Sequence, residues 1–118
     1  MFGSKKTMEI SSQVESIIGV NTSVKGSLSS SGALRIDGQF EGDVSLSADL
    51  IIGESGRATA QIVAKNALVA GSVTGNMDIT DKLELLPTAK VVGDIKVGSL
   101  IIGEGATFKG KCEMRQES

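Results

Sequence analysis

The stretch LIIGEGATFKGKCEM, residues 100–114, decides the fold, because the chain contains this phrase more than once. It is matched by LIIGESGRATAQIVA at residues 50–64 and, more weakly, by SIIGVNTSVKGSLSS at residues 16–30. In each copy an apolar residue ends the Ile pair, a second apolar residue follows six positions later, and a small residue comes two positions after that. The three sets are Ile18, Val24 and Gly26; Ile52, Ala58 and Ala60; and Ile102, Phe108 and Gly110. Such self-similarity indicates one supersecondary unit stacked on itself.

The spacing can be followed from residue 16 onward, which gives six units. Apolar and polar residues alternate within each unit, as in strands that bury one face. The second apolar site falls at residues 24, 40, 58, 73, 91 and 108, so the units advance by 16, 18, 15, 18 and 17 residues. We predict an all-β, single-domain parallel β-helix of about six three-strand rungs. It is expected to be right-handed, because uneven units break the strict hexapeptide of left-handed helices. A β-sandwich or up-and-down barrel also alternates, but has no reason to hold one phrase in register through six units.

The alternation also predicts which residues face the core. The small site at residues 26, 42, 60, 75, 93 and 110 is expected to be a corner without room for a side chain. Pro87 and several glycines fall in the turn between the first two apolar sites. The predicted inward positions are Ile18, Val24, Gly26 and Leu28; Leu34, Ile36, Phe40, Gly42, Val44 and Leu46; Leu50, Ile52, Ala58, Ala60, Ile62 and Ala64; Leu68, Ala70, Val73, Gly75, Met77 and Ile79; Leu83, Leu85, Val91, Gly93, Ile95 and Val97; and Leu100, Ile102, Phe108, Gly110, Cys112 and Met114.

The composition of the 118 residues argues against several classes of function. There is no His, which removes the commonest general base and metal ligand, and the single Cys cannot form an internal disulfide. A net charge of −2 and 3% aromatic residues give no basic patch and no stacking platform for nucleic acid. No apolar run approaches the ~20 residues that span a bilayer, and the N-terminus has no signal-peptide core. We expect a cytoplasmic protein.

Two enzymatic interpretations fail on particular residues. Hexapeptide-repeat acyltransferases use a catalytic His, which this chain lacks. The segment GATFKGKC, residues 105–112, approaches a phosphate-binding loop, but Cys112 replaces the Ser or Thr that would hold Mg²⁺, and too few residues follow for a helix. Cys112 occupies an inward position and is expected to be a small core residue. We predict no enzyme activity, no nucleotide, no metal and no other cofactor.

The repeats resemble those of the bactofilin family. The resemblance rests on LRIDGQFEGDV at residues 34–44 and AKVVGDI at residues 89–95, and covers residues 18–114. It implies a right-handed parallel β-helix between disordered tails that polymerises end to end, without nucleotide, into non-polar bacterial cytoskeletal filaments. Such filaments lie on the inner face of the cytoplasmic membrane and organise cell-shape or cell-wall partners. The alternative is a β-helical adaptor that binds a protein partner without polymerising.

The predicted domains are a flexible N-terminal tail at residues 1–15, a β-helix at 16–114 and a C-terminal tail at 115–118. An uncapped solenoid leaves its end strands unpaired over an apolar stack, which invites another copy. The resemblance implies an aromatic residue at the C-terminal polymer interface, although Phe108 could instead fill the core as Phe40 does. The predicted polymerisation residues are Phe108, Ile102, Cys112 and Met114 at the C-terminal end, and Ile18 and Val24 at the N-terminal end.

Two further surfaces are expected to bind. Met1 and Phe2 beside Lys5 and Lys6 combine apolar and positive character, which suits weak attachment to an anionic membrane unless the segment is simply disordered. The outward sites of the first strand form a partly apolar stripe, which is a candidate for side-by-side filament contacts unless a tail covers it. The stripe comprises Ile17, Ile51, Val69 and Ile101, interrupted by Arg35 and Glu84.

Overall fold

The computed structural model describes residues 16–115, and this part of the chain consists of strands, turns and bends. All the strand pairings in it are parallel, as a solenoid requires. The strands are β1 (Ser16–Ile18), β2 (Ser23–Ser30), β3 (Leu34–Ile36), β4 (Gln39–Leu46), β5 (Asp49–Ile52), β6 (Arg57–Ala64), β7 (Asn66–Val69), β8 (Ser72–Thr74), β9 (Met77–Leu85), β10 (Lys90–Val92), β11 (Ile95–Ile102), β12 (Thr107–Lys109) and β13 (Cys112–Met114).

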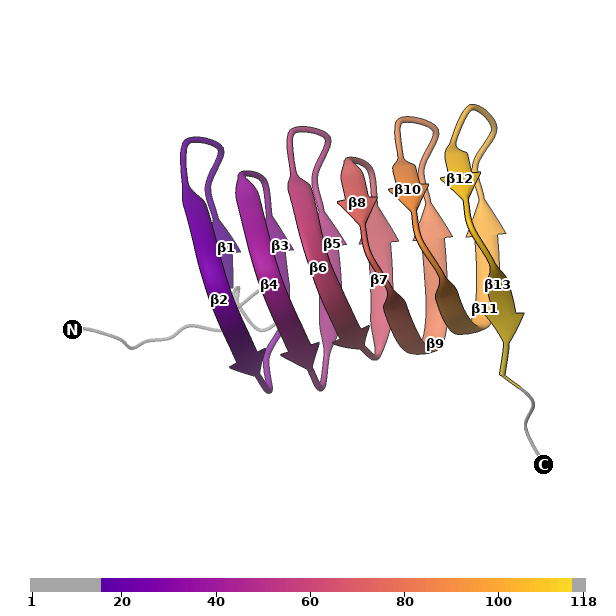
Figure 1. Cartoon of the computed structure of the whole chain (residues 1–118), viewed down its shortest axis with the longest axis horizontal. Helices are drawn as coiled ribbons and strands as arrows, with labels where there is room; N and C mark the ends of the chain where they lie inside the picture. The colour runs from indigo at the N-terminus through magenta and orange to yellow at the C-terminus, as the bar shows by residue number, and fades with distance from the viewer. Residues whose placement is uncertain (1–15, 116–118) are drawn as a thin grey trace.

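Figure 1 shows the strands as a coil that advances from one terminus to the other. β1, β3, β5 and β7 run upward on the far side of the view, and β2, β4 and β6 run downward on the near side. Because the chain advances from left to right as it turns in this sense, the coil is right-handed. The structure therefore confirms a right-handed parallel β-helix of about six turns.

Each turn has three faces, which are defined here by their residues. β2, β4 and β6 run through the corner between the second and third faces, whereas that corner separates β8 from β9, β10 from β11 and β12 from β13. The first face comprises residues 16–18, 34–36, 50–52, 67–69, 83–85 and 100–102. The second comprises residues 23–25, 39–41, 57–59, 72–74, 90–92 and 107–109, and the third residues 27–30, 43–46, 61–64, 77–79, 95–97 and 112–114.

The corner between the second and third faces is the predicted small site. Gly93 has φ +138°, a conformation that side-chain-bearing L-residues rarely adopt. A Cβ atom on Gly93 would lie 1.8 Å from the carbonyl oxygen of Gly75 in the turn before it. Gly42 lies against Gly26 in the same way. Glycine occupies this corner in five of the six turns, where successive turns stack backbone on backbone, and Ala60 occupies it in the third turn.

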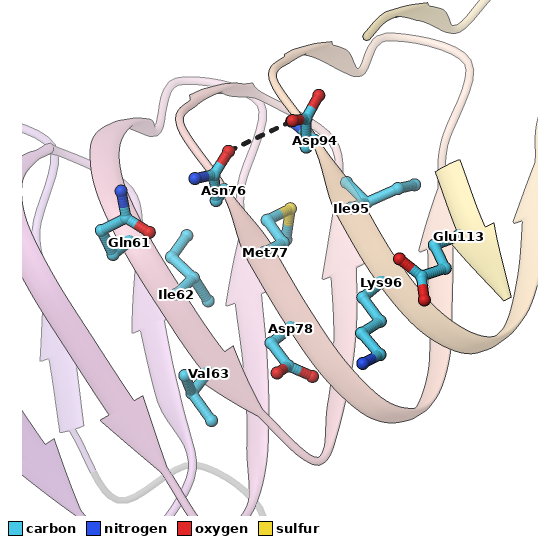
Figure 2. A pocket seen from close by; sticks show the side chains of 10 residues that line it. All are labelled: Gln61, Ile62, Val63, Asn76, Met77, Asp78, Asp94, Ile95, Lys96 and Glu113. Carbon is cyan, nitrogen blue, oxygen red and sulfur yellow. Dashed lines mark hydrogen bonds between the residues drawn. The ribbon is translucent and has the colours of Figure 1, made fainter. Parts of the chain in front are cut away.

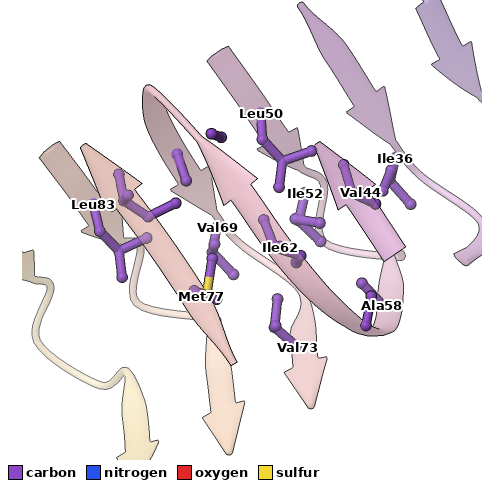
Figure 3. Packing of buried hydrophobic residues seen from close by; sticks show 14 of the residues in the cluster. Ile36, Val44, Leu50, Ile52, Ala58, Ile62, Val69, Val73, Met77 and Leu83 are labelled. Carbon is purple, nitrogen blue, oxygen red and sulfur yellow. The ribbon is translucent and has the colours of Figure 1, made fainter. Parts of the chain in front are cut away.

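The core is a stack of aliphatic columns, each of which repeats one inward site from turn to turn (Figure 3). Leu50, Ile52 and Val69 are fully buried, and no polar or charged residue among positions 16–115 is buried. Each buried aliphatic side chain contributes ~1.5–3 kcal/mol through the hydrophobic effect. The repeated phrase therefore encodes a continuous apolar column.

The prediction for the fourth unit is wrong by one residue. Ala67 and Val69 face the core, in register with Leu50 and Ile52, whereas Leu68 lies on the outside beside Ile51. The run of four apolar residues at 67–70 has no alternation from which the phase could be inferred. Polar contacts at the neighbouring corner fit the observed register, since the Asn66 amide donates to the Asp49 carboxylate at 3.1 Å.

Residues 16–115 contain no helix that is long and apolar enough to cross a membrane.

Candidate functional site

The C-terminal end of the solenoid is formed by the end of β11 together with β12 and β13. Its inward side chains continue the core columns: Ile102 lies over Leu85, Phe108 over Val91, Cys112 over Ile95, and Met114 over Val97. Leu100 joins them over Leu83. The four C-terminal residues predicted for polymerisation are therefore brought together on one turn.

This last turn leaves its apolar columns open. Ile102 is 48% exposed and Met114 is 49% exposed, whereas Leu85 and Val97 in the preceding turn are fully buried. Leu100 and Phe108 are half-buried and pack against the core. An apolar patch of this kind, at the end of a packed column, is typical of a surface that binds another protein.

The backbone at this end is open as well. Among residues 16–115, β12 pairs with β10 alone and β13 with β11 alone, so each has one free edge. Free N–H and C=O groups on a strand edge can pair with a strand of another chain. The end therefore offers hydrogen-bonding groups around an apolar centre.

Phe108 occupies the same column as Phe40 but a different environment. Phe40 is 2% exposed between its neighbours Val24 and Ala58. Phe108 rests on Val91 and is only half-buried, because no further turn follows it. Both expected roles, core filler and interface residue, are thus compatible with its position.

The expectation that Cys112 is buried is wrong. Cys112 lies in the inward column over Ile95, but it is exposed as a free thiol, 3.9 Å from the sulfur of Met114. The repeat predicts which column a residue joins, but a side chain in that column is buried only where a turn lies on each side of it. The last turn has a neighbour on one side only.

Arg115 fastens the last turn and was missed as a structural residue, because the C-terminal tail was expected to begin there. Its backbone N–H donates to the Val97 carbonyl at 2.6 Å, directly after β13 ends at Met114. Its side chain reaches back two turns, where Nε donates to the Ile79 carbonyl at 3.3 Å and the guanidinium contacts the Asp78 carboxylate.

The N-terminal end is less open than predicted. Ile18 is 7% exposed, and Val24 and Leu28 are half-buried. β1 and β2 have pairing partners on one side only among the described residues, namely β3 and β4. Val24 and Leu28 therefore supply the apolar part of this end. Leu28 was predicted to face inward but was not included among the predicted interface residues.

The outer column of the first face departs from the prediction at one site. Val69 is fully buried and cannot belong to an outer stripe; Leu68 takes its place. We call the corrected set the outer column: Ile17, Arg35, Ile51, Leu68, Glu84 and Ile101, in register from turn to turn. The predicted membrane-binding residues Met1, Phe2, Lys5 and Lys6 lie outside the described residues.

A groove of about 350 Å³ lies along the third face (Figure 2). Asn76 and Asp94 line it as part of a ladder: the Asp94 N–H donates to the Asn76 side-chain oxygen at 3.3 Å, and the Lys111 N–H donates to the Asp94 carboxylate at 3.2 Å. Asp78, Lys96 and Glu113 alternate in charge in the next column. The two hydrogen bonds of the ladder tie successive turns together.

The segment that resembles a phosphate-binding loop is spread over a turn and a corner. Gly105 lies in the turn before β12, and Gly110 is a corner glycine with φ +142°. β13 follows, where a phosphate loop would need the N-terminus of a helix. The segment is therefore not built as a phosphate site.

Comparison with known proteins gives concordant matches. A family model described as "Bactofilin: Polymer-forming cytoskeletal" matches residues 16–113. The chain is 36% identical to Bactofilin BacP of Myxococcus xanthus over 110 residues, which are 92% of this chain and 46% of that protein. It is 40% identical to Bactofilin BacO of the same organism over 98 residues, 83% of this chain and 78% of that protein. The chain thus spans about half of BacP and most of BacO. No solved structure matches it.

Proposed function

Because this chain belongs to the bactofilin family of polymer-forming cytoskeletal proteins, we propose that it polymerises end to end, without nucleotide, into non-polar filaments. These filaments lie on the inner face of the cytoplasmic membrane and organise cell-shape or cell-wall partners. The observation that carries the proposal is the open apolar turn at the C-terminal end. Its half-exposed side chains would be removed from water when the same turn of a second copy packs on them.

A non-polar filament joins like ends, so each contact is isologous. At the C-terminal contact, Ile102, Phe108 and Met114 of one copy pack against the corresponding turn of the next. The N-terminal contact is made through Val24 and Leu28, with Ile18 beneath them. Free strand edges around each apolar centre add hydrogen bonds between copies. No step in this assembly requires nucleotide, because burial of apolar surface supplies the driving force.

The first prediction is that the wild-type protein forms filaments in nucleotide-free buffer, and that Phe108→Arg does not. A guanidinium at the centre of the end contact would be desolvated without a partner. Thr107→Arg is the matched control, since Thr107 is the outward-facing neighbour of Phe108 on the same strand and should leave the filaments intact. Negative-stain electron microscopy and sedimentation measure the outcome. Cys112 should react with maleimide in Phe108→Arg and be protected in filaments.

The proposal fails if the wild-type protein forms no filaments, or if Phe108→Arg and Thr107→Arg polymerise equally well. The first outcome would favour the alternative, a β-helical adaptor that binds a protein partner as a single unit.

The second prediction concerns the membrane. We propose that residues 1–6 attach filaments to anionic lipid through Met1 and Phe2, which insert, and Lys5 and Lys6, which contact headgroups. One such segment binds marginally, but a filament presents many and gains avidity. Filaments should pellet with vesicles that contain anionic lipid, and a variant lacking residues 2–6 should not. Neutral vesicles are the control, and equal pelleting of both proteins with anionic vesicles would contradict the proposal.

A further inference from the structure

The first face is the outer surface with an apolar column. Ile51 and Leu68 occupy its two middle turns, and Ile17 and Ile101, which are 63% and 46% exposed, occupy its ends. Within residues 16–115, the other two faces each carry a single large apolar residue that points outward and is exposed, Val92 and Val63. In Figure 1 the first face is formed by the strands on the far side of the coil and runs along its length, not across its ends. Its apolar column therefore cannot be explained by end-to-end contacts.

The order of residues in the outer column is nearly the same in both directions. From the first turn to the last it runs Ile, Arg, Ile, Leu, Glu, Ile, and the reverse order differs only by exchanging Arg with Glu and Ile with Leu. When two such columns face each other in opposite directions, each Arg35 lies opposite a Glu84. When they face each other in the same direction, Arg35 opposes Arg35 and Glu84 opposes Glu84. The charges therefore distinguish the two arrangements.

We propose that the first face binds the first face of a second copy in antiparallel orientation, about a twofold axis that runs parallel to the strands between β5 and β7. In this pairing Ile51 packs on Leu68 of the other copy, Ile17 packs on Ile101, and two Arg35–Glu84 ion pairs flank the apolar centre.

The environment of the two charges supports this pairing. Glu84 is half-buried between Leu68 and Ile101 and forms no ion pair with residues 16–115. Arg35 is oriented by Asp37, which accepts from its Nε atom at 2.9 Å, and the terminal nitrogens of its guanidinium have no hydrogen-bond partner within the described part of the chain. Each protomer thus presents, at symmetric positions, one oriented cation and one carboxylate that has no ion-pair partner within residues 16–115.

The shape of the face sets the strength of the contact. Six turns at a strand spacing of about 4.8 Å give a column about 30 Å long and one short strand wide. The surface that two such columns can bury is well below the ~1,000 Å² that a stable interface needs, so a single pair of protomers binds weakly through this face. In a filament the contact repeats at each subunit, and avidity makes side-by-side binding firm. The inference goes beyond end-to-end polymerisation, although bundling rests on it.

The test is a charge exchange in the full chain. Wild-type filaments should associate side by side, and Arg35→Glu or Glu84→Arg should release single filaments, raising the protein concentration needed for bundling about tenfold or more. The double variant should bundle again. The carboxylate introduced at position 35 remains beside Asp37 in the double variant, so repair of local repulsion cannot account for this rescue. Electron microscopy of bundle width measures the result. Bundles in either single variant, or none in the double variant, would overturn the proposal.

A second measurement does not need filaments. In a Cys112→Ser, Phe108→Arg background, Ile51→Cys and Leu68→Cys chains are mixed at high concentration with a short bis-maleimide, and the crosslinked peptides are identified by mass spectrometry. Antiparallel pairing should favour the mixed 51–68 product. Predominance of 51–51 and 68–68 products, or absence of crosslinks, would refute the face pairing even if filaments had formed. Absence of wild-type filaments together with the mixed product would reject the proposed polymerisation alone.

Discussion

At the scale of the residue, the corner glycines carry the strictest constraint in the fold. Gly26 and Gly42 have nearly the same backbone conformation, with φ +132° and +136°. They differ in what lies beside them: a Cβ atom on Gly26 would have nothing within 4 Å, whereas one on Gly42 would lie 1.8 Å from the Gly26 carbonyl oxygen. Alanine substitutions at these two positions therefore separate the free-energy cost of the strained backbone conformation from the cost of the clash between turns.

We therefore predict that Gly26→Ala lowers the free energy of unfolding by about 1–2 kcal/mol, through its strained φ alone. Gly42→Ala should cost about 1–3 kcal/mol more, because its methyl group would force two turns apart. Urea unfolding in the Phe108→Arg background measures both without interference from filaments. Equal losses in the two variants would mean that the turns are not in close contact at this corner.

At the scale of the element, β13 is paired on one side only, like β12, whereas β11 is paired on both sides. It has three residues and one pairing partner, β11. Arg115 adds a backbone hydrogen bond to Val97 and a side-chain hydrogen bond to Ile79. Because Asp78 and Arg115 are both partly exposed, their ion pair adds no more than about 1 kcal/mol. The arginine therefore acts locally, holding the last turn in place.

Arg115→Ala in the Phe108→Arg background should leave the unfolding midpoint nearly unchanged while the amides of residues 112–114 exchange about threefold to tenfold faster. The loss of the side-chain hydrogen bond to Ile79, ~1 kcal/mol, sets this range, and the exposed ion pair with Asp78 adds little to it. Hydrogen exchange read by mass spectrometry measures it, and Arg57→Ala, which removes an exposed arginine with no ion pair among residues 16–115, is the control. Unchanged exchange in β13 would show that Arg115 does not hold this strand.

At the scale of the whole molecule, the coil separates two kinds of surface. Its ends expose the core columns in cross-section, so contacts there extend the solenoid along its axis. The first face exposes a single apolar column with a charge at the second and fifth turns, so contacts there are lateral. Phe108→Arg changes contacts along the solenoid axis, and Arg35→Glu changes contacts perpendicular to it. Filament length should therefore respond to Phe108→Arg, and bundle width to Arg35→Glu.

The sequence by itself determined the right-handed coil, its six turns and most of its register. The turns and their register follow from local alternation and from one repeated phrase, and the handedness follows from the uneven length of the units, which breaks the strict hexapeptide of left-handed helices; all are properties of the chain alone. It did not determine the phase of β7, because four consecutive apolar residues fit either face of a strand. Only pairing with β5 placed Val69 in the core and Leu68 outside.

Burial was decided by the tertiary structure, since it depends on neighbours in space. Cys112 and Ile102 have inward positions identical in pattern to those of earlier turns, yet they are exposed because no turn lies beyond them. Arg115 gave no signal in the repeat, because it acts across two turns through a side chain. The symmetric order of the outer column was already present in the predicted stripe, with Val69 at the site that the structure gives to Leu68. Only the stacking of turns decided that Leu68 holds this site and that Arg35 and Glu84, 49 residues apart in the chain, lie in one column.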